Sequence, residues 1–370
     1  MKRYSEVVLN GHPDKFCDIV ADRLIREIYK TDLQAYAQIE VSVWSDIIFL
    51  SGGVVTKKKL EFSVSEVIYE VGFAIGYTAE NYIDVKQYKI MDHICWVVSD
   101  PGKWTNYSND QSIVVGYAGY DNLTRYLPPE HFLCWYFREA LITSMMEGAL
   151  KNQGPDGKIL IIMNEENSQW RLNTVLITLQ QKESLSFFDF TDTTVNVLRA
   201  AYQNLQTKDL RWSEEWKDVK VLINPNGPLL NGGSDGDNGQ TGRKLVMDYY
   251  GPRIPIGGGA LYGKDLSHID RIGAFAARRF ALNMVKNGSR EATVIICFAP
   301  GMNEPLSIDI ASDKRPYVDA EEYFLFSCMK ERIDLGDMNY NLWELGSFYN
   351  QTLSFNSNLD KSIISQHNYV

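Results

Sequence analysis

Apolar and polar residues alternate along the chain with two different periods, and segments of the two kinds follow one another. Apolar positions three or four residues apart indicate an amphipathic helix over residues 16–28, which Asp14 precedes. The same spacing predicts helices over residues 64–77, 132–150, 190–204 and 269–285. Alternating or short apolar runs predict strands over residues 37–44, 47–50, 88–98, 158–163, 174–179, 219–224, 293–299 and 307–311.

Turn residues separate several of these elements. Ser51-Gly52-Gly53 is expected to form a turn after the strand at 47–50, and residues 300–303 join the last two strands. The mixture predicts an α+β fold in which each mixed or antiparallel sheet is covered on one face by helices. A polar stretch at 100–110 and a glycine-rich one at 224–242 are candidate boundaries. We therefore expect three similar subdomains, which comprise residues 1–104, 105–224 and 225–370.

Composition narrows the class of protein. The chain has 370 residues, of which 45% are apolar, so it can bury a sizeable core. Its formal net charge of −10 argues against nonspecific binding of nucleic acid. No stretch approaches the ~18 consecutive apolar residues of a membrane span, so we expect no membrane contact. The five scattered cysteines and the lack of a secretory signal indicate a cytoplasmic protein with reduced thiols.

Two glycine-rich segments, residues 232–244 and 257–265, are the strongest candidates for a binding site. Glycine lets the backbone approach a ligand closely and turn its N–H groups toward an anion. The first segment ends in Arg243 and Lys244, and the second contains Lys264. These cations suit phosphate oxygens, so the two segments, about 20 residues apart, predict one polyphosphate site.

Two other interpretations of these segments fail. Residues 258–264 fit the spacing of a phosphate-binding P-loop, but Asp265 stands where a Ser or Thr should hold magnesium. The residues before them also make a poor buried strand. Asp235 and Asp237 have the spacing of calcium ligands, but the glycine and glutamate that complete a calcium loop are missing.

A third segment, Gly11-His12-Pro13-Asp14-Lys15, opens the first helix. It brings an imidazole, a carboxylate and an ammonium group to a helix N-terminus, where anions are favoured. Taken alone, it is equally well explained as a helix cap at Asp14 followed by an exposed Lys15.

In order and separation, these three segments together resemble S-adenosylmethionine synthetase, also called methionine adenosyltransferase. Asp110-Gln111 followed by Gly116-Tyr117-Ala118, and Ile223-Asn224-Pro225, are lesser matches. The resemblance extends from Gly11 to about Asp313. It implies that ATP, L-methionine and water are converted to S-adenosylmethionine, phosphate and diphosphate. The methionine sulfur would attack the ribose C5′, and the released tripolyphosphate would then be hydrolysed.

The resemblance assigns roles residue by residue. His12 would donate a hydrogen bond to the departing oxygen, and no protein nucleophile is needed. The catalytic cations would be Lys158, Arg243, Lys244 and Lys264. The nucleotide would also contact Asp156, Asp237 and Ala260, and the substrate side would include Asp110, Asp237 and His268. Two Mg²⁺ ions per site would use Asp14 and Asp270, and Glu40 would bind K⁺. The family forms homodimers with shared active sites. Whether two dimers pair into a tetramer is left undecided by the sequence.

Ordinary structural roles remain for several of these residues. Asp156 and Lys158 can belong to a plain turn before a strand. Glu40 can be a carboxylate at a strand edge, since the strand after it departs from the family by one residue in length. Asp270 can belong to the solvated first turn of its helix.

The chain also departs from the family pattern, mainly on the amino-acid side of the site. A glutamate that holds the methionine ammonium is replaced by Val54, and an expected lysine by His268. Pro228 and Leu229 replace a basic and an aromatic residue. Asn109 and Ser112 stand where glycines usually flank Asp110-Gln111.

Three hypotheses follow. The first is a divergent S-adenosylmethionine synthetase. The second is an enzyme of the same fold that uses another thioether or amino acid, or only hydrolyses tripolyphosphate. The third is a catalytically silent subunit that binds nucleotide and regulates a partner.

Overall fold

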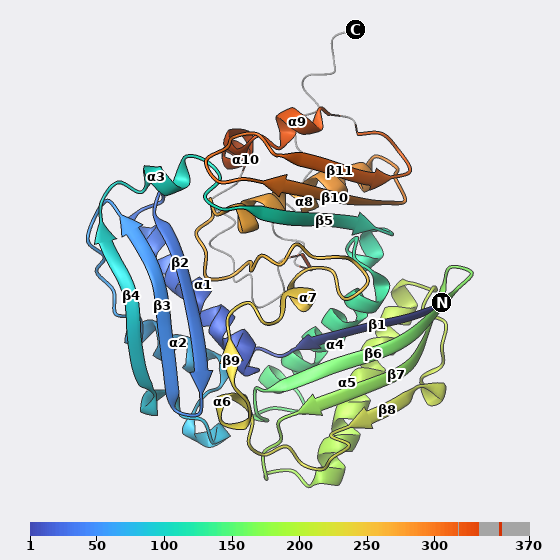
Figure 1. Cartoon of the computed structure of the whole chain (residues 1–370). Coiled ribbons are helices and arrows are strands. Elements are labelled where there is room, and N and C mark those ends of the chain that lie inside the picture. Colours follow the sequence, from blue (N-terminus) through green and yellow to red (C-terminus); the bar gives the residue numbers. More distant parts are fainter. Residues whose placement is uncertain (317, 333–347, 350–370) are drawn as a thin grey trace.

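The computed structural model describes residues 1–316, 318–332 and 348–349. Its larger strands form three sheets, which are arranged around the centre of the molecule (Figure 1). The first sheet, in the order β4-β3-β2-β9, contains β2 (Tyr36–Trp44), β3 (Ile47–Thr56), β4 (Lys89–Val98) and β9 (Gly239–Gln240). The second, β1-β6-β7-β8, contains β1 (Lys2–Val8), β6 (Gly157–Glu166), β7 (Gln169–Leu179) and β8 (Lys220–Ile223). The third, β11-β10-β5, contains β5 (Ser112–Gly119), β10 (Glu291–Phe298) and β11 (Ser307–Ser312).

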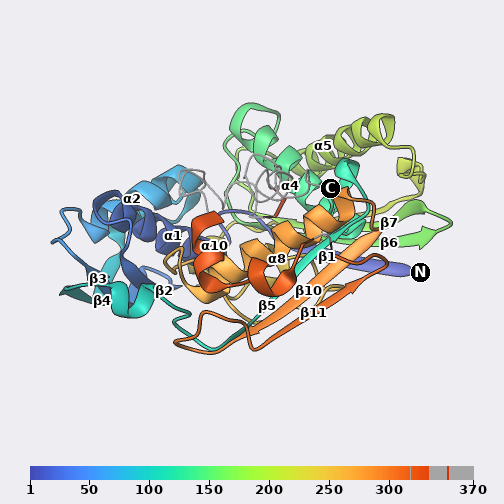
Figure 2. The ribbon, with the colours of Figure 1, turned by 90° about the horizontal axis from the view of Figure 1, so that it is seen from above.

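The long helices lie on one side of these sheets, as the view from above shows (Figure 2). Helices α1 (Pro13–Thr31) and α2 (Val64–Ile75) cover the first sheet, α4 (Pro129–Glu147) and α5 (Phe187–Lys208) the second, and α8 (Ile269–Lys286) the third. The short helices are α3 (Gly102–Thr105), α6 (Gly233–Gly236), α7 (Leu245–Asp248), α9 (Ala320–Tyr323) and α10 (Phe326–Arg332). The predicted α+β architecture, with helices on one face of each sheet, is confirmed.

Alternating burial shows why each sheet has one covered and one open face. Along β2, Ile39 and Val41 are buried under α1, whereas Gln38 and Glu40 point to the other side. Helix α8 packs on β5 at Gly116, where an added Cβ would lie 2.1 Å from the carbonyl carbon of Ala277. A larger residue at this position would push the helix away from the sheet.

All five predicted helices are present, with ends shifted by at most a few residues. The prediction of a turn at Ser51-Gly52-Gly53 was wrong, because these residues lie inside β3. Gly52 has φ +142°, and an added Cβ would collide with the carbonyl oxygen of Gln38 on the neighbouring strand. Glycine is therefore needed here because β2 approaches β3 closely, and not because the chain turns. Strands β1, β5 and the two-residue β9 were not predicted.

Each sheet takes strands from distant parts of the chain. Strand β1 pairs antiparallel with β6, β5 pairs antiparallel with β10, and β9 joins the free edge of β2. These pairings cross the boundaries expected at 104/105 and 224/225, and the division into three subdomains stays a prediction. The part of the expected third subdomain at 333–347 and 350–370 lies outside the described residues. Among those described, no helix has the length and apolar character that a membrane span requires.

Candidate active site

The N-terminus of α1 is the first element of the site. His12 is its N-cap, and Nδ1 of the ring accepts a hydrogen bond from the backbone N–H of Asp14 at 3.2 Å. Pro13 follows at the first helical position, where its missing N–H costs nothing. Gly11 packs against Pro155, because an added Cβ would lie 2.5 Å from the Pro155 carbonyl carbon. This contact fixes the helix start beside the turn that carries Asp156.

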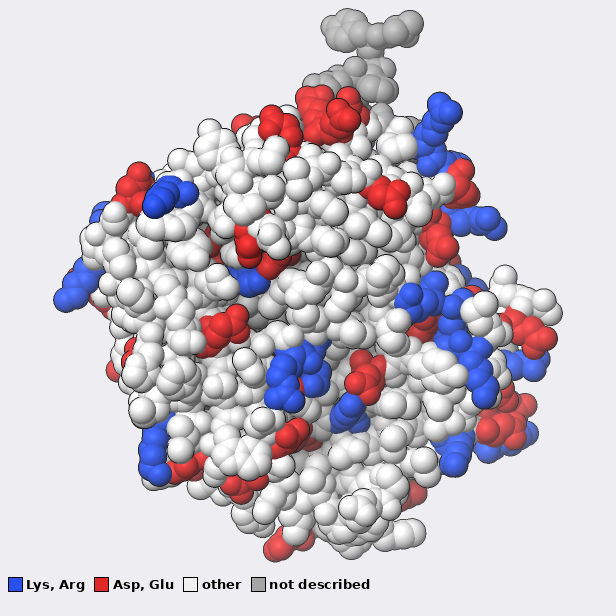
Figure 3. All heavy atoms as spheres, viewed as in Figure 1, with Lys and Arg blue, Asp and Glu red and all other residues white. Residues whose placement is uncertain are grey.

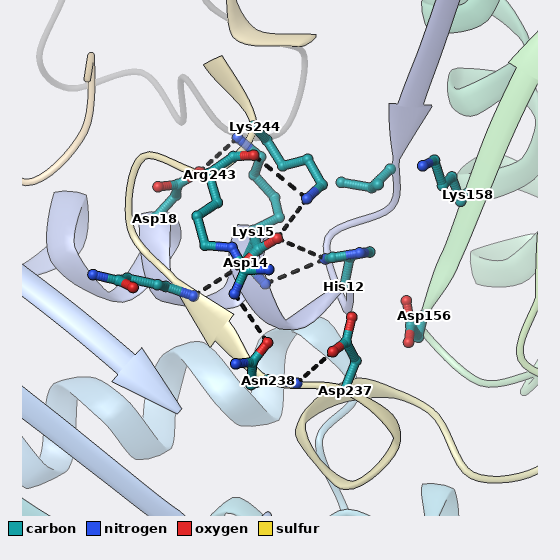
Figure 4. A network of polar contacts seen from close by, with 12 residues as sticks. His12, Asp14, Lys15, Asp18, Asp156, Lys158, Asp237, Asn238, Arg243 and Lys244 are labelled. Carbon is teal, nitrogen blue, oxygen red and sulfur yellow. Dashed lines mark hydrogen bonds and ion pairs between the residues drawn. The ribbon is translucent and has the colours of Figure 1, made fainter. Parts of the chain in front are cut away.

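Asp14 is almost completely buried and collects contacts from the first glycine-rich segment (Figure 4). Its Oδ2 accepts from Nζ of Lys244 at 2.5 Å, and its Oδ1 lies 3.4 Å from Nε of Arg243. The backbone N–H of Gln240 also donates to Oδ1, at 2.9 Å. The structure thus brings His12, Asp14 and two of the predicted phosphate-facing cations together.

Next to Asp14 along α1 lies a buried ion network that the sequence analysis missed. Nζ of Lys15 donates to Asp18 at 2.9 Å and to Asp248 at 2.5 Å, and all three side chains are at most 1% exposed. Two carboxylates raise the pKa of Lys15 above its usual value, although burial acts against this. Burial raises the pKa of Asp248 to about 6. Asp18 also accepts from the backbone N–H of Gly242 at 2.9 Å. The network anchors the loop that carries Arg243 and Lys244 to α1.

Asp156, Lys158 and Asp237 surround His12 on the other side (Figure 4). Oδ2 of Asp156 accepts from the backbone N–H of Gly233 at 2.7 Å, and desolvation raises the pKa of this carboxyl to about 6. Nζ of Lys158 forms an ion pair with the carboxylate of Glu6 on the neighbouring strand β1, at 2.8 Å. Asp237 is exposed, and its Oδ1 accepts from the backbone N–H of Asn238.

The N-terminus of α8 repeats the arrangement of α1. His268 is the N-cap, and its Nδ1 accepts from the backbone N–H of Asp270 at 3.2 Å. Nζ of Lys264, from the second glycine-rich segment, donates to Oδ2 of Asp270 at 2.5 Å. Gly259 leaves room for this carboxylate, because an added Cβ would lie 2.4 Å from the carboxyl carbon of Asp270.

The segment that leads into β5, with the first residue of that strand, completes this second cluster. One ligand atom each of Asp110, His268 and Asp270 lies within 4.8 Å of the others. The hydroxyl of Ser112 donates to Oδ1 of Asp270 at 2.5 Å, and Oδ1 of Asn109 accepts from the N–H of Ile269. The two residues that replace the family's glycines therefore have definite partners at the start of α8.

The edge of β2 that faces away from β3 binds both glycine-rich segments side by side. Residues 37–39 bond to the second segment: Ile39 donates to the carbonyl of Gly263 at 2.7 Å, and Gln38 is bridged to Lys264. Two residues further on, Val41 bonds to Thr241 of the first segment, and Thr241 also donates to the carboxylate of Glu40. The anchor points are thus about 7 Å apart along one strand. Ala260 packs near Gly242, which joins the segments directly.

The surroundings of both capping histidines disfavour the doubly protonated, charged ring. Burial, followed by the positive charge of Lys244, lowers the pKa of His12 to about 4. Burial, followed by the charge of Lys264, lowers the pKa of His268 to about 4 as well. Each ring is therefore neutral near pH 7. Because each Nδ1 accepts a backbone N–H, the proton of the neutral ring resides on Nε2.

Comparison with known proteins places this site in a family. The N-terminal domain of S-adenosylmethionine synthetase matches residues 2–96, and the C-terminal domain of S-adenosylmethionine synthetase matches residues 231–355. An S-adenosylmethionine synthase of Helicobacter pylori (strain HPAG1) is 31% identical over 82% of this chain and 79% of its own length. The chain belongs to the S-adenosylmethionine synthetase family.

Other members extend the comparison. An S-adenosylmethionine synthase of Borreliella afzelii is 29% identical over 83% of this chain and 80% of its own length. The solved structure of an unusual S-adenosylmethionine synthetase from Campylobacter jejuni covers 99% of this chain and 98% of its own, with a TM-score of 0.82 and 21% identity. This structure supports the fold. The predicted family and enzyme class are confirmed.

S-adenosylmethionine synthetases generally use a divalent metal and potassium, and the residues present fit such ions. Asp14 and Asp270 offer carboxylate oxygens, which Mg²⁺ prefers, and each is contacted by a lysine that an ion could replace. Gly259 keeps the space beside Asp270 open. Glu40 lies on the open face of the first sheet, and its carboxylate accepts a hydrogen bond from the hydroxyl of Thr241. Both groups offer oxygen atoms, the ligands that a hard cation such as K⁺ takes.

The valine at position 54, where the family pattern has a glutamate, is a core residue. Val54 is 1% exposed and belongs to the apolar core of the molecule. Its side chain therefore provides no polar group to a substrate. A carboxylate partner for a substrate ammonium, which the family pattern would place here, is absent at this position of the chain.

Proposed function

We propose that the enzyme transfers the adenosyl group of ATP to the sulfur of L-methionine and then hydrolyses the tripolyphosphate to phosphate and diphosphate. His12 supports this step because its tautomer is fixed: Nδ1 is occupied, so Nε2–H is available as a donor to the oxygen that leaves C5′. Arg243, Lys244 and Lys264 meet the negative charge that grows on the released chain. A fixed donor or charge of this kind contributes about 3–4 kcal/mol to the transition state.

Positioning accounts for much of the remaining acceleration. Sulfur, carbon and oxygen must lie in line, and rigid loops hold the nucleotide in that geometry. The ion network of Lys15 with Asp18 and Asp248 makes the first loop rigid, and the edge of β2 holds the second. Two Mg²⁺ ions at Asp14 and Asp270, when bound, would neutralise triphosphate charge, and K⁺ at Glu40 would support the strand edge between them.

One observation carries this proposal. Along a single strand edge, β2 fastens two glycine-rich segments, each with its own lysine and its own aspartate at a helix N-terminus. A ligand with several linked anionic groups is needed to use both halves, and the triphosphate of ATP has this form. A monoanionic ligand would leave one lysine–aspartate pair without a role.

We further propose that a second copy of the chain covers the open face of the sheets. In Figure 3 the charged side chains near the centre of this face are surrounded by broad uncharged areas. Trp44, Phe49 and Met91 lie on the first sheet with 58%, 41% and 47% of their surface exposed. Phe49 lies opposite the helix-covered face, because its neighbours Ile48 and Leu50 are buried. Exposed apolar surface of this kind marks a contact between proteins, so we propose a homodimer.

The test of the proposed reaction is a product balance. Purified enzyme with ATP, methionine, Mg²⁺ and K⁺ should form S-adenosylmethionine, diphosphate and phosphate in equal amounts. Lack of S-adenosylmethionine with all four present would reject the proposal. Chelation of Mg²⁺ should abolish product formation, and its return should restore it.

A second candidate is the same reaction with another acceptor. It is favoured by Val54, which offers no carboxylate to an acceptor ammonium at this position, and by the neutral His268 in place of a lysine. An unpaired ammonium would cost about 1–3 kcal/mol of binding. Competition among methionine, its decarboxylated analogue and its N-acetyl derivative separates the two: methionine is preferred under the first proposal and is outcompeted under the second.

A further inference from the structure

A buried cation directly follows each of the two aspartates at the helix N-termini of the site. Lys15 follows Asp14 and anchors the first glycine-rich segment to α1 through its ion network. Arg271 follows Asp270 on α8, and its side chain is 0% exposed. The proposed reaction gives Arg271 no role. Because a buried guanidinium is costly to remove from water, its contacts show what it holds in place.

The guanidinium of Arg271 contacts two other elements. Its Nη1 donates to the backbone carbonyl of Lys264 at 2.7 Å, and its Nη2 donates to Oδ1 of Asp22, on α1, at 2.9 Å. Asp22 is itself 1% exposed, and its Oδ2 lies 3.3 Å from Nε of Arg26. The planar guanidinium fixes the directions of both bonds at once. One side chain of α8 therefore joins α1 to the second glycine-rich segment.

The segment lies against α1 at the same level. Gly263, with φ +75°, precedes Lys264, and an added Cβ would lie 3.2 Å from Cβ of Ala21. The same Cβ would lie 2.3 Å from the carbonyl oxygen of Ile39 on β2. The backbone before Lys264 is thus packed between α1 and β2, and Arg271 holds it from the side of α8.

These contacts set distances within the candidate active site. Asp14 and Asp22 are about two turns apart on α1, and Asp270 and Arg271 are neighbours on α8. The Arg271–Asp22 pair therefore fixes the two helices that carry Asp14 and Asp270. Helix α8 also holds Lys264 at both ends, because Arg271 binds its carbonyl and Asp270 binds its Nζ.

We propose that Arg271 and Asp22 form a positioning pair for the triphosphate site. The pair keeps Lys264 and Asp270 at the spacing from Asp14 that a chain of linked phosphates requires. This inference rests on the proposed function and deepens it. Arg271 is a positioning residue, because its guanidinium is fully buried and acts through Lys264 and Asp270. The competing explanation is that the ion pair only stabilises the fold.

Two changes separate positioning from stability. Asp22→Asn keeps an oxygen that accepts from Arg271 but removes the negative charge, so the buried guanidinium loses its counter-charge. Asp22→Leu combined with Arg271→Met, the apolar pair, replaces both charges by apolar side chains, a change that is often neutral for stability. The apolar pair makes neither of the two hydrogen bonds.

Arg278→Lys is the matched control. Arg278 lies on the same helix and is also 0% exposed, but its guanidinium binds backbone carbonyls near the end of β5, away from Ser112. These carbonyls belong to Tyr117, Arg125 and Tyr126. For each variant the measurements are the melting temperature, calorimetric binding of tripolyphosphate with Mg²⁺, and kcat and KM for ATP.

The proposal predicts that stability and binding change in opposite order in the two designs. Asp22→Asn should melt earlier, because breaking a buried pair is destabilising, yet bind tripolyphosphate within about threefold of the unmodified enzyme. The apolar pair should melt within about 3 °C of the unmodified enzyme yet bind tripolyphosphate about tenfold more weakly. Its kcat should fall by about 10²-fold, since a displacement of about 1 Å has an effect of this size.

Arg278→Lys should melt earlier and bind tripolyphosphate normally. The proposal is overturned if the apolar pair binds tripolyphosphate as tightly as the unmodified enzyme. It is equally overturned if binding across the three variants falls in the order of their melting temperatures, since the pair would then only stabilise the fold. Tripolyphosphate binding needs no turnover, so these results are distinct from a failure of the proposed reaction, which the product balance reports.

Discussion

Truncation of Arg243 is the most informative test of how the site stabilises the leaving chain. Its guanidinium is 44% exposed, lies 3.4 Å from Asp14 and donates to the side chain of Asn238 at 2.9 Å. Because exposed ion pairs contribute only about 0.2–1 kcal/mol, Arg243→Ala should barely change the free energy of unfolding. The Lys244–Asp14 pair remains to keep the buried carboxylate satisfied.

The kinetic effect should be much larger. If Arg243 meets charge that appears only as C5′–O cleavage proceeds, its loss should lower kcat by about 10²–10³-fold, or about 3–4 kcal/mol. Affinity for ATP should change by less than about threefold. Rapid-quench measurement of S-adenosylmethionine formation in a single turnover, together with equilibrium binding of a nonhydrolysable ATP analogue, gives both numbers. Arg290→Ala, at an exposed arginine, is the control. A loss confined to ATP affinity, with kcat unchanged, would refute the reasoning.

Three further variants test other parts of the account. Gly259→Ala places a Cβ 2.4 Å from the carboxyl carbon of Asp270, so product formation should fall at least about tenfold while circular dichroism shows an intact fold. Burial lowers the pKa of His131 to about 4 from 6.5, so its contribution to stability is complete above pH 6.5 and is lost as pH falls toward 4. In thermal scans, His131→Gln should therefore lose less stability than the unmodified protein between pH 7 and 4.5, by up to about 3 kcal/mol; equal losses would contradict this. Phe49→Lys puts a charge on the open sheet face and should shift the sedimentation coefficient from dimer to monomer, whereas an unchanged value would place the interface elsewhere.

Local signals in the sequence predicted the parts of the fold that local physics controls. The helices followed from apolar spacing. Their caps did not, because Asp14 was considered as the cap of α1, whereas His12 caps α1 and His268 caps α8. Strand β1 was missed because its partner β6 lies about 150 residues away and its own pattern, with Lys2, Arg3 and Glu6, is mostly polar. The glycines of β3 were misassigned because only the neighbouring strand shows why they are needed.

The candidate site also has a part that the sequence predicts and a part that only the folded chain shows. Glycine-rich segments with terminal cations can be found in sequence, since glycine and cations together indicate phosphate. The network of Lys15, Asp18 and Asp248 cannot, because a lysine in a first helical turn is usually exposed and Asp248 is 233 residues away. The pairing of Lys158 with Glu6 and the shared edge of β2 also depend on contacts that only the folded chain brings together.

The central claim is that the fixed cations and the two capped helix ends receive the whole triphosphate as sulfur displaces it from C5′. A crystal structure of the enzyme with a nonhydrolysable ATP analogue, methionine and Mg²⁺ tests it most directly. The account predicts phosphate oxygens within hydrogen-bond distance of Lys264 and of Arg243 or Lys244, with the C5′ oxygen at Nε2 of His12. A triphosphate lying away from His12 and from both glycine-rich segments would contradict it.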